Sequence, residues 1–308
     1  MKAIRIHEFG EPNVLKYEDI PESQPGPGEV RIKVIAAGVN PVDWKIRSGY
    51  MELPLPITMG SDIAGVVDVA GQGVESFQPE DEVFGKASPG QGGYAEYTVV
   101  NSSQIAQKPK SIGFVESAAI PTAGLAAWQS LFDIAGLERG QTVLIHGAAG
   151  GVGSFAVQFA KWKSAYVIGT ASSKNAEFLK SIGCDEVIDY KNQQFEDIVG
   201  NLDVVLDTIG GDTLEKSWGV LKPGGFLVTT VASIPEEKTQ KYGVRAERLM
   251  TQANGKELAQ IAAIIDEHKI KPIVTTVLPL ADAQKAHEMS ESGHTRGKIV
   301  LRVAEDPK

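Results

Sequence analysis

The stretch VLIHGAAGGVGSFAVQFAKW, residues 143–162, places a run of small residues between an apolar segment and an amphipathic one. Every residue from 147 to 153 except Val152 is glycine or alanine. The segment before the run is typical of a buried strand, and the segment after it is typical of a helix. A strand that turns directly into a helix directs free N–H groups and the positive end of the helix dipole at whatever lies above the sheet. Phosphate is the usual occupant, so the stretch predicts a phosphate-binding turn.

The spacing within this turn matches G-x-G-x-x-G with alanine at the first position, giving Ala148, Gly150 and Gly153. Gly150 lets a pyrophosphate approach the backbone, and Gly153 lets the helix pack close to the strand. The alternative is an ordinary tight turn, but a strand before it and a helix after it are the context that dinucleotide binding requires. The predicted cofactor-binding residues of the turn are Ala148, Ala149, Gly150, Gly151, Val152 and Gly153.

The chain changes character near residue 112. Residues 112–270 alternate buried strands with amphipathic helices, which predicts βαβ units and an open, doubly wound parallel sheet. Residues 1–110 hold short extended runs separated by glycine and proline, which predicts a β-rich, barrel-like module. The last segment returns to extended runs around a helix at 281–291 and is expected to add strands to that module. We therefore predict one domain from residues 1–120 completed by 272–308, and a second from residues 121–271.

The composition narrows the class of protein. The chain has 308 residues, of which 42% are hydrophobic and 22% charged, and a formal net charge of −9. This charge argues against a nucleic-acid partner. No apolar run reaches the roughly 20 residues that span a bilayer, and the N-terminus lacks the apolar region of a signal peptide. We expect a cytoplasmic protein without a membrane partner, in which the single cysteine, Cys184, is a packing residue.

The end of the second strand of the parallel sheet decides which dinucleotide is expected. An NAD site usually carries an acid there, which bonds the ribose 2′-hydroxyl. The segment AYVIGTASSKN instead ends in Ser172, Ser173 and Lys174. Hydroxyl groups and a cation suit a 2′-phosphate, which a carboxylate would repel. NADPH is therefore the predicted cofactor, and a solvated loop that happens to contain a lysine is the alternative.

Several segments together resemble the zinc-free quinone oxidoreductase branch of the medium-chain dehydrogenase/reductase superfamily. The resemblance covers nearly the whole chain and implies a GroES-like β-rich catalytic domain plus a Rossmann domain, an α/β fold. The segments that carry it are AAGVNPVDWKIRSG (36–49), GSDIAGVVDVAGQGV (60–74), EDEVFG (80–85), GGYAEY (92–97), AAIPTAGLAAWQSL (118–131), HGAAGGVG (146–153) and SGHTRGKIVL (292–301).

The resemblance also bears on zinc. Zinc-dependent relatives place a cysteine soon after the AAG strand and a histidine in a GHE segment, where this chain has Asn40 and Ser61-Asp62. A catalytic zinc ion needs three protein ligands, and the five histidines show no shared spacing. No metal is predicted, which leaves hydride transfer from NADPH to a quinone or an α,β-unsaturated carbonyl, because conjugation spreads the arriving negative charge.

The predicted substrate-side residues are Asn40, Asp43 and Tyr50. Asn40 would donate to a carbonyl oxygen, and Tyr50 would supply a proton or stack on a flat acceptor. Their structural alternatives are a turn cap for Asn40, a helix cap for Asp43 and a loop filler for Tyr50. The resemblance further implies that Thr122 lies close to the nicotinamide, Tyr190 near the adenosine phosphate and the segment of Arg296 near the cofactor. Val231 is also predicted to contact the cofactor.

Two other functions stay open: an enone or acrylate-type double-bond reductase, and a non-catalytic NADPH-binding sensor or structural protein. A homodimer is also expected. The β-branched run at 224–232 comes last in the predicted sheet, and an unpaired apolar edge strand is an association surface. The alternative is that residues 233–250 fold over this edge and leave a monomer.

Overall fold

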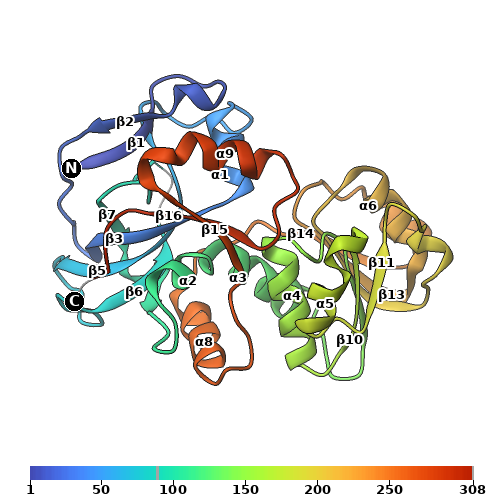
Figure 1. The fold of residues 1–308 in the computed structure, drawn as a ribbon. Coiled ribbons are helices and arrows are strands. Elements are labelled where there is room, and N and C mark those ends of the chain that lie inside the picture. Colours follow the sequence, from blue (N-terminus) through green and yellow to red (C-terminus); the bar gives the residue numbers. More distant parts are fainter. Residues whose placement is uncertain (88–89, 307–308) are drawn as a thin grey trace. The chain divides into compact units, whose positions relative to one another are not determined.

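The computed structural model describes residues 1–87 and 90–306, and its contacts divide the chain into two compact units (Figure 1). The first unit comprises residues 1–125 and the segment from residue 253 onward, and the second comprises residues 126–252. The expected ranges placed residues 253–271 in the second unit. Helix α8 (Gly255–Asp266) instead packs within the first, where the Asp266 carboxylate accepts hydrogen bonds from the N–H groups of Lys110 and Ser111.

The first unit is built on two β-sheets, and one of them combines both ends of the chain. Strand β16 (Lys298–Arg302) pairs antiparallel with the end of β3 (Glu29–Val39), so the last segment does complete the β-rich module. The strand orders are β2-β1-β4 and β15-β16-β3-β5-β6-β8, with β7 pairing β3. The other strands are β1 (Lys2–Ile6), β2 (Lys16–Asp19), β4 (Ile57–Thr58), β5 (Asp62–Ala70), β6 (Glu82–Lys86), β7 (Tyr97–Asn101), β8 (Ile105–Gln107) and β15 (Val274–Pro279).

The second unit contains the predicted parallel sheet. Its order, β11-β10-β9-β12-β13-β14, is that of a doubly wound dinucleotide-binding fold. All of its strand pairs are parallel, and the order reverses between β9 and β12. The fold class predicted from the sequence is therefore confirmed. The strands are β9 (Thr142–Ile145), β10 (Tyr166–Ala171), β11 (Glu186–Asp189), β12 (Leu202–Asp207), β13 (Leu221–Thr229) and β14 (Arg245–Arg248).

The helices follow the predicted rhythm closely. Pro121 stands at the first position of α3, where proline is tolerated because its missing N–H has no partner within the helix, and a π-helical segment, Gln129–Ile134, follows α3. The α-helices are α1 (Pro41–Arg47), α2 (Phe114–Ala118), α3 (Pro121–Trp128), α4 (Gly151–Trp162), α5 (Ala176–Ser181), α6 (Gly211–Ser217), α7 (Glu236–Tyr242), α8 and α9 (Ala283–Glu291). The 3-10 turns are Pro12–Val14, Ser102–Gln104, Ser173–Asn175, Phe195–Asp197, Trp218–Val220 and Leu280–Asp282.

The prediction that residues 224–232 form an edge strand is wrong. Strand β13 lies between β12 and β14, and its residues Phe226–Thr229 pair with Arg245–Arg248. The alternative, that residues 233–250 cover this edge, describes the structure. Strand β14 has the sequence RAER and lacks an apolar pattern, which is why it was missed. Charged side chains on an edge strand discourage pairing with other chains, so the apolar run of β13 is not an association surface.

Candidate functional site

The glycine turn, residues 147–153, joins the end of β9 to the start of α4 as predicted. Gly147 has a φ of +66°, a conformation that favours glycine. A Cβ atom on Gly153 would lie 2.3 Å from the carbonyl oxygen of Gly147 and 2.6 Å from the Cα of Ala148. The helix begins without a side-chain cap and without an acidic residue in its first turn. No carboxylate of the helix's own first turn therefore competes for the free N–H groups at its start, which suits the N-terminus to an anion.

The residues of the turn divide into two groups. Ala148 and Ala149 are buried, and the Ala148 N–H donates to Thr170 O on strand β10. Ala148 therefore packs the turn onto the sheet. Gly150, Gly151 and Val152 are only partly buried, so they form the part of the turn that a ligand can reach.

The end of β10 carries the three residues predicted to select the dinucleotide. Ser172 is buried, whereas Ser173 and Lys174 are exposed. The Ser173 hydroxyl and N–H hydrogen-bond the carboxylate of Asp189, which ends the neighbouring strand β11. Sequence reasoning missed this acid because it belongs to the next strand. Tyr190 follows it and is 53% exposed.

Asp207 organises the carboxyl ends of β12 and β13, next to the point where the strand order reverses. Its side chain is fully buried and accepts from the N–H groups of Ile209 and Gly210 and from the Thr229 hydroxyl. Val231 lies two residues after Thr229, the last residue of β13, and its N–H lies 3.3 Å from the Thr229 hydroxyl oxygen. Ligands of open α/β sheets bind beyond the carboxyl ends of the strands at such a reversal, so this position suits the predicted contact of Val231.

A polar cluster in the first unit contains two of the three predicted substrate-side residues. Asn40 follows β3, and its backbone N–H donates to the Asp43 carboxylate (2.7 Å), which is how an acid three residues into a helix helps to cap it. The Tyr94 hydroxyl donates to the same carboxylate at 3.0 Å. Asp43 thus makes the helix-capping contact that was its structural alternative. It also bonds Tyr94, which is not part of the helix cap.

Lys298 and Asp62 form the other half of the polar cluster. The Lys298 ammonium donates to the Val39 carbonyl oxygen (2.9 Å) and to Oδ1 of Asn40, and it lies 3.8 Å from the Asp62 carboxylate. Asp62 in turn accepts from the N–H and the hydroxyl of Thr122, at 3.1 and 2.5 Å. Asn40, Asp43, Asp62, Tyr94 and Lys298 are all buried, and Thr122 is partly buried.

Burial shifts the titration of the cluster. Desolvation, reinforced by the nearby Asp62, raises the pKa of Asp43 to about 7, while hydrogen bonds from Asn40 and Tyr94 and the charge of Lys298 oppose the shift. Desolvation lowers the pKa of Lys298, and the two carboxylates act against this. Desolvation and Asp43 hold the pKa of Tyr94 well above its usual range. The Lys298 ammonium lies against Asp62, whereas Asp43 accepts from the Asn40 N–H and the Tyr94 hydroxyl, so Asp43 is the member of the cluster that exchanges a proton near neutral pH.

Tyr50 and Arg296, which were also predicted as site residues, make other contacts than those of the polar cluster. Tyr50 is 76% exposed, and the Lys45 ammonium lies 5.9 Å from the centre of its ring. The carbonyl oxygen of Arg296 accepts from the Thr275 hydroxyl. Asp62 and Lys298 were missed as site residues, although each is a charge inside a run that reads as a buried strand, which is the signal that could have found them.

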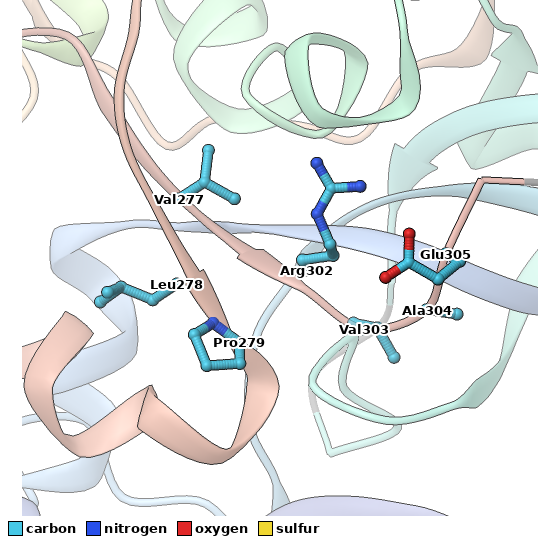
Figure 2. Close-up of a pocket in the computed structure, with 7 residues that line it drawn as sticks. All are labelled: Val277, Leu278, Pro279, Arg302, Val303, Ala304 and Glu305. Carbon is cyan, nitrogen blue, oxygen red and sulfur yellow. The ribbon is translucent and has the colours of Figure 1, made fainter.

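A separate hollow of about 480 Å³ lies along the paired strands β15 and β16 (Figure 2). Arg302 is the cation on its lining and lies 3.6 Å from the Asp306 carboxylate. None of the predicted site residues lines this hollow, so it does not belong to the candidate site. The lining residues are Val277, Leu278, Pro279, Arg302, Val303, Ala304 and Glu305.

Two negative findings apply to residues 1–87 and 90–306. No three histidine, cysteine, aspartate or glutamate side chains gather there in a way that could hold a metal ion. No helix in this part of the chain has both the length and the apolar character to cross a membrane.

Comparison with known proteins agrees with this architecture. Residues 26–110 match the family model of the alcohol dehydrogenase GroES-like domain, and residues 182–301 match that of the zinc-binding dehydrogenases. The chain is 36% identical to the 2-methylene-furan-3-one reductase of Solanum lycopersicum, covering 98% of this chain and 79% of the relative.

Two solved structures have closely similar folds. The quinone oxidoreductase of Coxiella burnetii is 37% identical with a TM-score of 0.91, covering 98% of this chain and 99% of that one. The Escherichia coli quinone oxidoreductase complexed with NADPH is 29% identical with a TM-score of 0.91, covering 98% and 100%.

A GroES-like β unit combined with a doubly wound parallel sheet and a glycine turn defines an oxidoreductase of the dehydrogenase/reductase class. The chain belongs to the medium-chain dehydrogenase/reductase superfamily, in its quinone oxidoreductase branch. The resemblance seen in the sequence is thereby confirmed.

Proposed function

We propose that the protein is an NADPH-dependent, zinc-independent oxidoreductase that reduces a conjugated carbonyl compound, either a quinone or an enone. The observation that carries the proposal is the glycine turn, in which Gly153 has no room for a Cβ atom and the partly exposed residues Gly150–Val152 open the helix. This arrangement fits the pyrophosphate of a dinucleotide. The likeness to the NADPH complex of the Escherichia coli quinone oxidoreductase supports the choice of cofactor.

Bound NADPH would supply the hydride, and the residues of the chain would bind and orient the reactants and exclude water. Ser172, Ser173 and Lys174 would hold the 2′-phosphate. Thr122 would contact the cofactor through a hydroxyl oxygen whose proton is engaged by Asp62. Asn40 would donate to the acceptor oxygen, where negative charge develops as hydride arrives, and a fixed donor at that point stabilises the transition state.

The polar cluster does not fit a zinc ion, although the matched family model is that of zinc-binding dehydrogenases. Asn40 and Ser61 stand where zinc-dependent relatives have the cysteine and the histidine, and Asn40 and the adjacent Asp62 both face the Lys298 ammonium. A divalent cation there would meet a buried positive charge and an amide that zinc rarely uses. We therefore expect dialysis against a strong chelator to leave folding and NADPH oxidation unchanged. Stoichiometric zinc that is lost together with activity would contradict this.

An acceptor panel tests the proposed reaction. Loss of NADPH absorbance would be followed with benzoquinones, with cyclohexenone as a simple enone, and with cyclohexanone as a non-conjugated control. Turnover with a conjugated acceptor, but not with cyclohexanone, is expected. The ratio of kcat/KM values between the quinone and enone arms would identify the preferred class. The 2-methylene-furan-3-one reductase relative supports including the enone arm.

The panel also separates the non-catalytic alternative. Tight NADPH binding without turnover of any acceptor would indicate a sensor or structural protein. The homodimer and the cytoplasmic location stay predictions. Light scattering in solution tests the first, and a mass near 33 kDa, that of one chain, would contradict it.

A further inference from the structure

We propose that Lys298 is a positioning residue, whose ammonium group fixes the Asn40 carboxamide so that its Nδ2–H donor is available to the carbonyl oxygen of the acceptor. The inference rests on the proposed function, which supplies the acceptor. It assigns a role to a lysine that is not among the site residues predicted from the sequence.

The chemistry of the ammonium group determines which way the amide lies. An ammonium group carries three donors and no acceptor, whereas a carboxamide has an oxygen that accepts and a nitrogen that donates. The Lys298 Nζ donates to Asn40, so the amide must present Oδ1 to it. Nζ is held in turn by the Val39 carbonyl oxygen and by the Asp62 carboxylate. Lys298 is only 4% exposed, so packing limits alternative positions of its ammonium group.

The other end of the amide lacks a partner. Asn40 is 3% exposed, and its Nδ2 is buried without a hydrogen-bond partner in the described part of the chain. A buried donor is costly to leave unpaired, and native structures rarely do so without a reason. We therefore infer that the Asn40 Nδ2–H group donates to an acceptor atom of a bound ligand. A carbonyl oxygen has the matching chemistry, and it gains negative charge during the reduction.

The same ammonium group also holds Asp62, the hydrogen-bond acceptor for Thr122. It lies beside Asp62, which accepts from both the N–H and the hydroxyl of Thr122. Because the Thr122 proton is used in this way, the hydroxyl oxygen is left to accept. One buried cation thus fixes the direction of two hydrogen-bonding groups, of which Asn40 is in direct contact with it.

Lys298→Met tests the proposal, because methionine fills a similar space without a donor. We expect kcat/KM for the conjugated acceptor to fall roughly 10- to 100-fold, the usual effect of misplacing a group that acts on the substrate. Lys298→Gln keeps a donor for Asn40 Oδ1 and should recover part of the loss. If Lys298 served only to balance the charge of Asp62, the Gln and Met variants would be equally impaired.

Lys108→Met is the matched control. Lys108 lies in the same unit with a side chain only 6% exposed, and its ammonium donates to the carbonyl oxygens of Pro109 and Ile112. This substitution removes a similarly buried lysine away from the polar cluster. It should lower the melting temperature without changing kcat/KM. An equal kinetic loss in Lys108→Met would overturn the proposal, since the effect would then reflect stability.

A double-mutant cycle with Asn40→Ala tests whether Lys298 acts through Asn40. If it does, Lys298→Met should lower kcat/KM less than about threefold in the Asn40→Ala background, because residues that act as a unit are non-additive. The same fold-loss in both backgrounds would overturn the inference while leaving the proposed function intact.

The side-chain amide of Asn40 gives a readout that needs no turnover. Its ¹⁵N–¹H signals, assigned by their loss in Asn40→Ala, should shift in Lys298→Met and stay in place in Lys108→Met. Unchanged signals in Lys298→Met would overturn the positioning role. If the wild-type protein turned over no acceptor, the proposed function would fail, and this spectrum would still decide whether Lys298 holds the amide.

Discussion

The glycine turn of the second unit and the polar cluster of the first differ in how their residues are distributed along the chain. The turn is formed by seven consecutive residues, 147–153, whereas the cluster draws on positions from Asn40 to Lys298. The turn depends on backbone N–H groups and on the absence of side chains. The cluster depends on buried charges that hold one another in place. A binding site formed by consecutive backbone groups can therefore be predicted from a sequence, whereas a site assembled by tertiary contacts cannot.

The comparison also predicts how each region responds to change. In the turn, one added methyl group meets backbone atoms that cannot move without disturbing β9 and α4. In the cluster, a substitution changes charge and hydrogen bonding while the surrounding strands persist. Substitutions in the turn should act on folding and cofactor binding together, and those in the cluster should act on reaction and pH dependence.

The largest effect is expected for Gly153→Ala. Its Cβ would lie 2.3 Å from the Gly147 carbonyl oxygen, so the turn must open and carry its N–H groups out of position. Overpacking of this kind costs about 1–3 kcal/mol of stability, and we expect NADPH affinity to fall more than 100-fold. Gly219→Ala is the control, since a Cβ there meets no atom within 4 Å. NADPH titration by fluorescence compares the two variants, and equal affinities would contradict the importance of the turn.

A smaller effect is expected at the end of β10. Lys174→Ala should weaken NADPH binding about tenfold and leave NADH binding nearly unchanged, because a charge-assisted hydrogen bond contributes about 1.5–3 kcal/mol. Asp189→Asn should strengthen NADPH binding, since its carboxylate lies beside Ser173. Dissociation constants for both cofactors test this. Equal wild-type affinities for NADPH and NADH would contradict the predicted preference.

Most of the second unit was predictable because each strand, helix and turn has its own local pattern. The exception was β14, whose four residues, RAER, carry charges suited to an edge and no alternation of apolar residues. Without it, β13 appeared to be the edge of the sheet. The predicted edge at β13 was therefore wrong because β14 was not recognised. The charged sequence of β14 suits an exposed edge strand and lacks the apolar pattern of a buried one.

The first unit was predictable in class but not in its cluster. Asn40 and Asp43 were identified from a motif, and the contact of Thr122 with Asp62 could not be read from residues 60 positions apart. Tyr94 is fully buried like a core residue, yet its hydroxyl donates to Asp43. Arg47 is a charged residue that is nevertheless buried, and it donates to the Gly10 carbonyl oxygen and to Glu291.

Asp43→Asn should change how the melting temperature depends on pH. The difference in melting temperature between variant and wild type should shift by several degrees across the pH range. The pKa of Asp43 is raised from 3.8 to about 7 in the folded protein. Between these values the folded state holds a proton that the unfolded chain releases, so stability falls as pH rises from about 4 to about 7. Asp62, Lys298 and Tyr94 face this group and set the size of the effect.

Asparagine can still accept from the Asn40 N–H and from the Tyr94 hydroxyl, but it does not ionise. The melting temperature of Asp43→Asn relative to wild type should therefore rise from about pH 5 to about pH 8. A constant difference across this range would contradict the raised pKa. The acceptor kcat/KM should likewise lose an inflection near pH 7 in the variant.

The two buried histidines, one in each unit, give the smallest expected effect and the closest comparison. Burial lowers the pKa of His146 to about 4, and burial together with Arg47 lowers that of His287 to about 3. Both rings are therefore neutral when folded. The unfolded chain gains their protons below about pH 6.5, so stability falls as pH drops below this value and is unaffected above it.

Their surroundings differ. The His146 ring lies 3.1 Å from the Thr170 hydroxyl and 3.0 Å from that of Ser217. Ser217 already donates to the Thr213 carbonyl oxygen, so His146 Nε2 is the donor to Ser217 and Nδ1 accepts from Thr170. Neither ring nitrogen of His287 has a hydrogen-bond partner in the described part of the chain, and the ring makes a T-shaped contact with Tyr94, with ring centres 5.9 Å apart.

His287→Phe and His146→Phe should therefore behave differently at neutral pH. Phenylalanine at 287 loses no hydrogen bond, so the melting temperature near pH 7.5 should stay within about 2 °C of wild type. At 146 it leaves the buried Thr170 hydroxyl unpaired, at a cost of about 1–3 kcal/mol, or several degrees. Near pH 5, the melting temperature of His287→Phe should rise relative to that of wild type. The unfolded wild-type chain is stabilised by protonation of His287, and the variant has no such group. Equal melting-temperature losses in both variants at pH 7.5 would show that shape, rather than hydrogen bonding, sets the role of these rings.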